Sequence, residues 1–134
     1  MKSFDNGGRE AYEEEVKEKW GKTAAYKEYA EKTKNYTKDK RNALTAEMNG
    51  ILAEFSERMK NGEEPGSAEA QILVKKLQDH ITENYYHCTD EILAGLGRMY
   101  TADERFKNNI DKNGGGTAEY IGRAIEIYCG HIAG

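Results

Sequence analysis

One stretch of the chain constrains its fold more than any other. Residues 44–59 carry apolar side chains at intervals of three and four, namely Leu44, Met48, Ile51, Leu52, Phe55 and Met59. This spacing places all of them on one face of an α-helix. Thr37 is a typical N-cap and Asn61-Gly62 a typical helix end, so the pattern predicts one long amphipathic helix between them.

The same rules predict helices along most of the chain. Thr23 is expected to cap a helix that runs to Lys34, and Ser67 to cap a helix that runs towards Tyr85. The inward residues of the latter are Leu73 or Val74, Leu77, Ile81 and Tyr85. No segment alternates with the two-residue period of a strand, and the chain has a single proline. The sequence therefore predicts an all-α fold.

Three further helices are expected in the second half of the chain. Thr89-Asp90-Glu91 marks a fresh helix start after a bend near His87-Cys88, and Thr101 to Glu104 fits a capping box. Thr117 is expected to cap the last helix. Gly95 and Gly97 lie inside a predicted helix, where each costs about 1 kcal/mol relative to alanine. Their presence predicts close backbone packing there.

Length and charge limit the domain organisation and the partners. A chain of 134 residues suits one domain, so we predict a single domain over residues 1–134, with a helical core at 37–130 and a mobile or lid-like segment at 1–36. The net charge is −4, and the lysines of residues 17–40 alternate with acids. This pattern is typical of a solvated helical surface and indicates no nucleic-acid binding through this chain.

The cysteines and the hydropathy pattern indicate the compartment. The two cysteines, Cys88 and Cys129, form no CxxC pair, and residues 1–10 contain no apolar run of a signal peptide. No run of apolar residues approaches the length of a membrane span. We therefore expect a cytoplasmic domain with reduced thiols and no membrane partner.

Several short phrases, taken in order, resemble one known family. They are Trp20-Gly21-x-Thr23-x-Ala25-Tyr26-x-Glu28, Tyr36-Thr37, His80-Ile81, Tyr85-Tyr86-x-Cys88-Thr89-x-Glu91, Gly95-Leu96-Gly97-x-Met99-Tyr100, Asp103-x-Arg105-Phe106 and Gly116-Thr117-Ala118-Glu119-Tyr120. The ordered set, from about Phe4 to Cys129, resembles the TipAS thiopeptide-antibiotic-recognition domain of MerR-type transcription regulators. No single phrase is specific by itself.

The resemblance implies a fold and a function. It implies a compact, globin-like helical domain with a deep cleft for thiopeptides or similar peptide-like, hydrophobic drugs. In that family the domain is usually the effector-sensing half of a transcription activator, behind a winged helix-turn-helix and a dimerising coiled coil. This sequence shows neither part, so the alternative is a stand-alone drug-sequestering protein. We favour the effector domain, and without the coiled coil we expect a monomer.

Cys88 is the strongest candidate for a residue that reacts covalently with a ligand. Thiopeptides carry dehydroalanine, an alkene to which a thiolate adds to form a thioether, and the resemblance implies that Cys88 is the cysteine that couples to them. At the start of the Thr89 helix, the pKa of this thiol is expected to fall below its usual value near 8.5. The alternative is a small buried hydrophobic side chain.

The other candidates are polar and aromatic groups. His80, Asn84 and Cys88 would share a face if their helix continued, although His80 could equally be a structural hydrogen bonder. More aromatic residues are present than a core requires, including Tyr29 and Tyr100, and tyrosine suits clefts for ring-rich ligands. Trp20, in a polar segment, is interpreted as part of a lid. The predicted ligand-binding set is Trp20, Tyr26, Tyr36, His80, Asn84, Tyr85, Tyr86, Cys88 and Met99.

Catalytic and metal sites are not expected. The chain has no Ser-His-Asp order, no HExxH, no phosphate loop and no convincing carboxylate pair, so we predict a binding protein and not an enzyme. The cysteine and histidine spacing matches no standard zinc pattern, and a globin-like shape does not confer haem, so no cofactor is expected. Asp103 with Arg105, and Asp111 with Lys112, are expected to form structural ion pairs, each contributing under ~1 kcal/mol.

Overall fold

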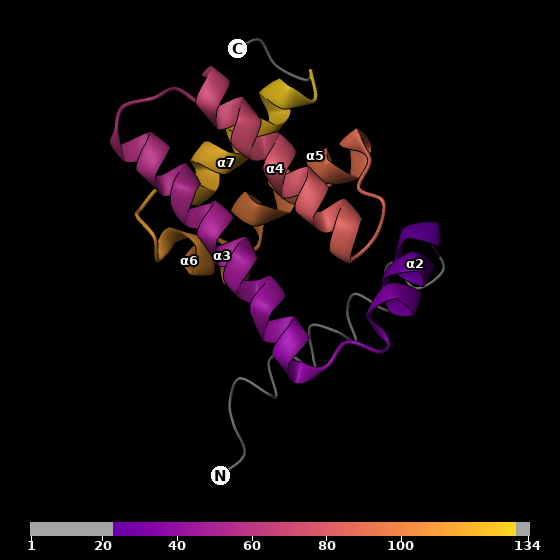
Figure 1. Cartoon of the computed structure of the whole chain (residues 1–134). Helices are drawn as coiled ribbons and strands as arrows, with labels where there is room; N and C mark the ends of the chain where they lie inside the picture. The colour runs from indigo at the N-terminus through magenta and orange to yellow at the C-terminus, as the bar shows by residue number, and fades with distance from the viewer. Residues whose placement is uncertain (1–22, 131–134) are drawn as a thin grey trace.

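The computed structural model describes residues 23–130, and within that range the regular structure consists of α-helices (Figure 1). The helices are α2 (Ala24–Thr33), α3 (Lys38–Lys60), α4 (Ala68–Asn84), α5 (Asp90–Ala102), α6 (Glu104–Asp111) and α7 (Thr117–Tyr128). The prediction of an all-α fold is confirmed. No helix of residues 23–130 is both long and apolar enough to cross a membrane.

Helix α7 is the centre of the arrangement, because it packs against α3, α4, α5 and α6. Figure 1 shows α3 and α4 running together in front of α5 and α7, with α6 at the left. Helix α2 stands apart from this group, beside the carboxyl end of α4. The five helices α3 to α7 therefore form the packed body, and α2 is an attachment at one end.

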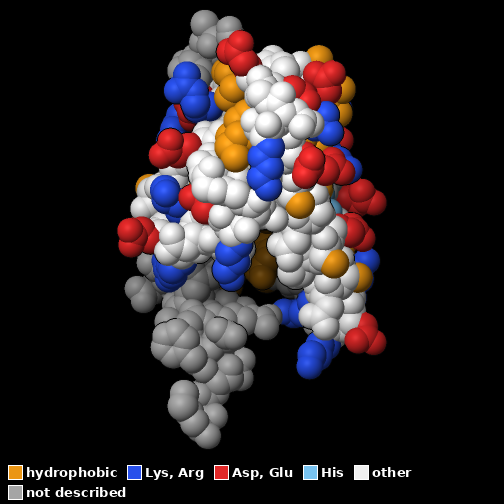
Figure 2. Space-filling view, turned by 90° about the vertical axis from the view of Figure 1, so that its left-hand side faces the viewer, with side chains coloured by type: hydrophobic (Ala, Val, Ile, Leu, Met, Phe, Trp, Pro, Cys, Tyr) orange, Lys and Arg blue, Asp and Glu red, His pale blue; other side chains and the backbone are white. Residues whose placement is uncertain are grey.

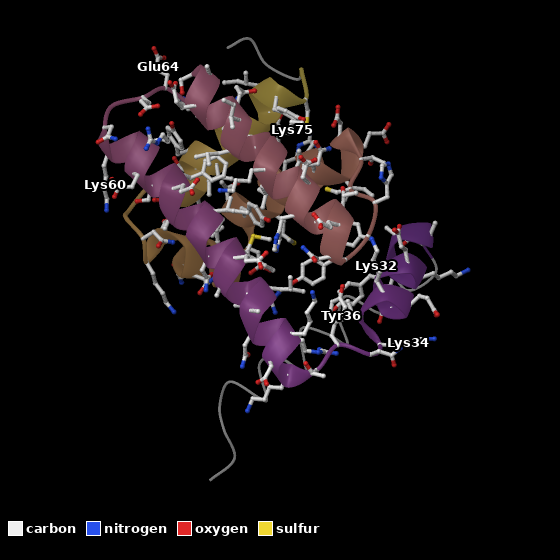
Figure 3. All side chains as sticks on the ribbon, in the orientation of Figure 1. Lys32, Lys34, Tyr36, Lys60, Glu64 and Lys75 are labelled. Carbon is white, nitrogen blue, oxygen red and sulfur yellow. The ribbon has the colours of Figure 1, made fainter. Side chains whose placement is uncertain are left out.

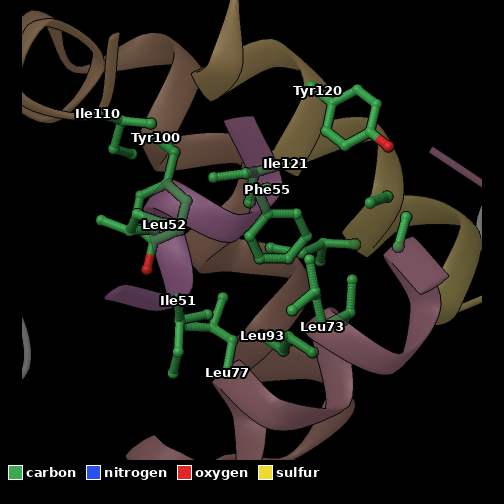
Figure 4. Close-up of a cluster of buried hydrophobic side chains, with 14 of the residues drawn as sticks. Ile51, Leu52, Phe55, Leu73, Leu77, Leu93, Tyr100, Ile110, Tyr120 and Ile121 are labelled. Carbon is green, nitrogen blue, oxygen red and sulfur yellow. The ribbon is translucent and has the colours of Figure 1, made fainter. Parts of the chain in front are cut away.

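The core is built from the apolar stripes of four helices (Figure 4). Phe55 of α3, Leu77 of α4, Leu93 of α5 and Ile121 of α7 are fully buried. Burying side chains of this size stabilises the fold by roughly 1.5–3 kcal/mol each. The predicted stripe of α3 is confirmed, since Leu44, Ile51, Leu52 and Phe55 are buried while Met48 and Met59 pack against the core.

The helix starts follow the capping rules at four positions. Thr23, Thr37, Ser67 and Thr89 each precede a helix and accept a hydrogen bond from the backbone N–H three residues later. Such a side chain satisfies one of the N–H groups that a helix start leaves open. Gly62 follows the C-cap Asn61 of α3 with φ 81°, a conformation that glycine adopts without strain. These predicted boundaries are confirmed.

Two predicted caps are wrong. Thr101 lies within α5, where its hydroxyl donates to the carbonyl of Arg98 at 3.0 Å. Asp103 caps α6 instead, because its carboxylate accepts from the Arg105 N–H at 2.9 Å. Thr117 is the first residue of α7, and Gly116 is the N-cap with φ 90°. The buried Thr117 hydroxyl donates to the carbonyl of Gly114 at 2.6 Å and fixes the preceding turn.

One of the two expected ion pairs forms as predicted. Arg105 Nη2 lies 2.7 Å from Asp103 Oδ2. Asp111 pairs with Lys107, one turn earlier in α6, at 3.3 Å. Its other oxygen accepts from the Ala118 N–H at 2.9 Å and so ties α6 to the start of α7. The predicted partner Lys112 is therefore wrong, because the i, i+4 position lies on the same side of the helix and the adjacent residue does not.

The two glycines of α5 differ in their surroundings. A Cβ at Gly97 would lie 3.2 Å from three atoms of Ile125 in α7, and a Cβ at Gly122 would lie 3.3 Å from the carbonyl oxygen of Gly97. Helices α5 and α7 therefore approach closely at this point. A Cβ at Gly95 would meet nothing within 4 Å. Close packing is confirmed at Gly97 and is wrong for Gly95.

This contrast predicts opposite effects for the same substitution. Gly97→Ala should lower the free energy of unfolding by roughly 1–2 kcal/mol, because the added methyl group overpacks the α5–α7 contact. Gly95→Ala should raise it by roughly 0.5–1 kcal/mol, because alanine favours a helix and the site has room. Urea unfolding of both variants measures this. Equal changes in the two variants would contradict the close contact.

Candidate functional site

The carboxyl end of α4 brings together two of the predicted ligand-binding residues. His80 and Asn84 lie one helical turn apart, and Asn84 Nδ2 donates to the backbone carbonyl of His80 at 2.9 Å. The same nitrogen lies 3.4 Å from His80 Nδ1. Glu47 of α3 reaches this ring too, with Oε1 3.5 Å from Nδ1. The imidazole is buried and is held by groups from two helices.

A line of aromatic rings extends from this point to α2. Tyr85, the C-cap of α4, meets the His80 ring edge-on at 6.0 Å and stacks on Tyr29 at 6.2 Å. Tyr29 in turn contacts Tyr26 at 5.9 Å. Burial raises the pKa of the Tyr85 hydroxyl, so it stays a neutral donor. The predicted ligand set leaves out Tyr29, although its spacing of three from Tyr26 is the signal that places both on one helix face.

Polar contacts fasten α2 to the same end of α4. The Tyr36 hydroxyl donates to the carbonyl of Asn84 at 2.6 Å, and Lys32 Nζ donates to the carbonyl of Thr82 at 2.7 Å. Both labelled side chains lie beside this end of α4 in Figure 3. A carboxylate oxygen of Glu28 accepts from the His87 N–H at 2.9 Å. The bonds of Tyr36 and Lys32 use carbonyl groups that the end of α4 leaves open.

The remaining candidates are placed differently. Tyr86 is half-buried and packs against the core, and its N–H donates to the carbonyl of Ile81 at 3.1 Å. Met99 belongs to α5 and also packs against the core. Trp20 lies outside the described residues, as does most of the segment 1–36 that is predicted to act as a lid. The structure therefore gathers Tyr26, Tyr36, His80, Asn84 and Tyr85 at one place.

Cys88 lies on a different side of α4. Its N–H donates to Thr82 Oγ1 at 3.1 Å, and its carbonyl accepts from Gln78 Nε2 at 2.9 Å. Residues 78 and 82 lie across the buried stripe of α4 from residues 80 and 84, because a helix turns about 100° per residue. The helix ends at Asn84, so Cys88 does not share the face of His80.

The environment of the Cys88 thiol opposes ionisation. The side chain is 2% exposed, and this burial raises the pKa of the thiol to about 12, with smaller contributions from Cys129 and Asp90. The expected lowering by the start of α5 is therefore wrong, because desolvation outweighs the helix dipole. At neutral pH about one thiol in 10⁵ is a thiolate. In this structure Cys88 is a small buried side chain, as in the alternative expectation, and its coupling to an antibiotic stays a prediction.

Figure 2 shows the side of the molecule where α3 and α6 lie. Lysine, arginine, aspartate and glutamate side chains are interspersed over this face. Neither the positive nor the negative side chains form a continuous stripe on it. A hollow in the same face has hydrophobic side-chain atoms at its floor. The exposed charges of this face therefore belong to a mixed, solvated surface.

The raised pKa of Cys88 predicts a characteristic pH profile. In a Cys129→Ser variant, the rate of alkylation of Cys88 by iodoacetamide should rise about tenfold per pH unit from about pH 7 to about pH 10, because the reactive thiolate keeps increasing below the pKa. Circular dichroism at each pH controls for unfolding. A rate that levels off near pH 8.5 would contradict the burial of the thiol.

The Tyr36 hydroxyl is predicted to hold α2 in place. Tyr36→Phe removes the bond to the carbonyl of Asn84 and should cost about 1 kcal/mol of local stability. Amide hydrogen exchange of residues 23–33 should then become faster by roughly fivefold, since a smaller free energy separates open and docked α2. Tyr26→Phe is the control, at a ring that contacts Tyr29. Unchanged exchange in Tyr36→Phe would show that this bond does not anchor α2.

Comparison with known proteins places these features in a family. Residues 12–128 match the family model of the TipAS antibiotic-recognition domain. The HTH-type transcriptional activator mta of Bacillus subtilis is 38% identical over 123 residues, which are 92% of this chain and 47% of that protein. The HTH-type transcriptional activator TipA of Streptomyces coelicolor is 39% identical over 122 residues, which are 91% of this chain and 48% of that protein. The chain thus spans about half the length of the curated relatives it matches.

A solved structure shows the same fold. It is described as the structural basis of a thiopeptide antibiotic multidrug resistance system from Streptomyces lividans, nosiheptide in complex with TipAS. The match has a TM-score of 0.82 at 36% identity and covers 93% of this chain and 87% of that one. The resemblance inferred from the sequence phrases is confirmed: the chain belongs to the TipAS antibiotic-recognition domain family.

Proposed function

We propose that this chain is the effector-sensing domain of a transcription activator and binds thiopeptide or similar peptide-like antibiotics. The observation that carries the proposal is the likeness to TipAS, at a TM-score of 0.82, in a structure that contains nosiheptide. The two relatives described as activators support the regulatory role. In this proposal the part of those proteins outside the matched region contacts DNA, and this domain contacts the antibiotic.

The residues at the end of α4 suit such a ligand. Tyr29 and Tyr85 offer stacked rings, and His80 and Asn84 add polar groups beside them. Ligand sites commonly combine a mainly apolar, aromatic lining with a few placed polar groups that fix orientation. Thiopeptides are rich in rings and amides, so both kinds of group in the ligand find a counterpart here.

We propose reversible recognition as the first step and no catalytic turnover. If Cys88 captures the antibiotic, its thiolate adds to the alkene of dehydroalanine, a carbon–sulfur bond replaces the π bond, and the adjacent carbon takes up a proton. A thiol with a pKa of about 12 that is buried against α4 must become exposed before it can do this. Covalent capture would therefore follow binding and would consume the thiol once, without making the chain an enzyme. We place this activity in the cytoplasm, where a transcription activator meets DNA, and expect the domain alone to be a monomer.

Calorimetric titration with nosiheptide tests the proposal. The wild-type domain should bind with a stoichiometry of one, and Tyr85→Leu should weaken binding by roughly tenfold, because the stacked ring next to His80 is lost. Tyr128→Leu is a matched control, since Tyr128 is also half-buried but bonds to Gln78 on another side of α4. Absence of any binding by the folded wild-type domain would refute the proposed function.

A further inference from the structure

The buried imidazole of His80 has one nitrogen that the described protein leaves without a partner. The side chain is 6% exposed, and Nε2 forms no hydrogen bond with residues 23–130. Among residues 23–130 it is the only buried side-chain nitrogen without a hydrogen bond. Buried polar atoms in proteins are nearly always hydrogen-bonded. A buried nitrogen without such a bond therefore indicates a hydrogen-bond partner outside residues 23–130.

The contacts of Asn84 bear on whether Nε2 of His80 donates or accepts a hydrogen bond. The carbonyl of His80 accepts from the Asn84 side chain at 2.9 Å, and only the amide nitrogen Nδ2 can donate that bond. The amide is thereby oriented with its second hydrogen towards His80 Nδ1, 3.4 Å away. When Nδ1 accepts that hydrogen, the neutral ring carries its own hydrogen on Nε2. In the protonated ring Nε2 also carries a hydrogen, and Glu47 then faces Nδ1 at 3.5 Å. Nε2 is therefore a donor in this tautomer and in the protonated ring.

The donor lies at the edge of the aromatic line of the candidate site. The Tyr85 ring meets the imidazole at an interplanar angle of 65°, and it also stacks with the Tyr29 ring at an interplanar angle of 27°. A flat ring that packs against these tyrosines brings atoms of its own edge towards the imidazole. The ligand class that fits is consequently one with an acceptor atom in or beside an aromatic ring.

We propose that the Nε2–H group of His80 donates a hydrogen bond to an uncharged acceptor of the antibiotic, either an azole nitrogen or an amide carbonyl oxygen. The inference rests on the proposed function and assigns to His80 the selection among ring-rich ligands. A ligand that places only carbon atoms at this edge leaves the buried N–H unpaired. Such a ligand is rejected more strongly than lost contact area alone would cause.

Two substitutions separate this role from simple packing. His80→Leu removes the donor and keeps an apolar side chain, so binding of nosiheptide should weaken by about tenfold while the domain stays folded. His80→Gln retains an N–H donor close to the position of Nε2 and should bind within about threefold of wild type. His87→Leu, at an exposed histidine of the same region, is the control and should bind as wild type does.

Nitrogen NMR of the histidine rings gives a second readout. In the free protein, His80 should show a hydrogen on Nε2, and addition of nosiheptide should shift that N–H signal and slow its exchange with water. The inference would be overturned if folded His80→Leu bound nosiheptide as tightly as the wild-type domain does. It would also be overturned if bound nosiheptide left the Nε2–H signal unchanged. Either result would leave the proposed function intact. Failure of the wild-type domain to bind nosiheptide at all would overturn both.

Discussion

The periodicity of α4 is the constraint on which the rest of the structure depends. Its buried stripe, which includes Val74, Leu77 and Ile81, packs into the core. Because an α-helix rotates by about 100° per residue, His80 and Asn84 lie on one flank of the stripe. Gln78 and Thr82 lie on the other flank. One helix therefore contributes to the core, carries the polar part of the candidate site, and bonds to the loop that contains Cys88.

The two flanks differ in how completely their polar groups are satisfied. On the Cys88 flank, Gln78 donates to the Cys88 carbonyl and to Asp90 and accepts from the Tyr128 hydroxyl, so that its amide is fully engaged. On the other flank, one nitrogen of the His80 imidazole, beside the Tyr85 ring, forms no hydrogen bond within residues 23–130. A closed network rigidifies its surroundings, whereas an open donor next to aromatic surface is suited to bind a ligand.

Local rules explain what could be predicted from the sequence. The helices capped by Thr37 and Ser67 were predictable because the side chain and the N–H that it accepts from lie three residues apart. The pairing of His80 with Asn84 follows from the same short range. The prediction that Thr117 caps α7 is wrong because the turn before it depends on the positive φ of Gly116. The raised pKa of Cys88 is not predictable from local patterns, because it follows from burial of the thiol in the core cluster.

We propose that the antibiotic binds where α2 meets the end of α4. Titration of the 15N-labelled domain with nosiheptide, followed residue by residue through its backbone amide signals, tests this most directly. We expect the largest shifts in α2, in residues 78–88 and around Glu47 of α3. Shifts concentrated in α6 and the amino-terminal half of α7, with the end of α4 unchanged, would contradict it.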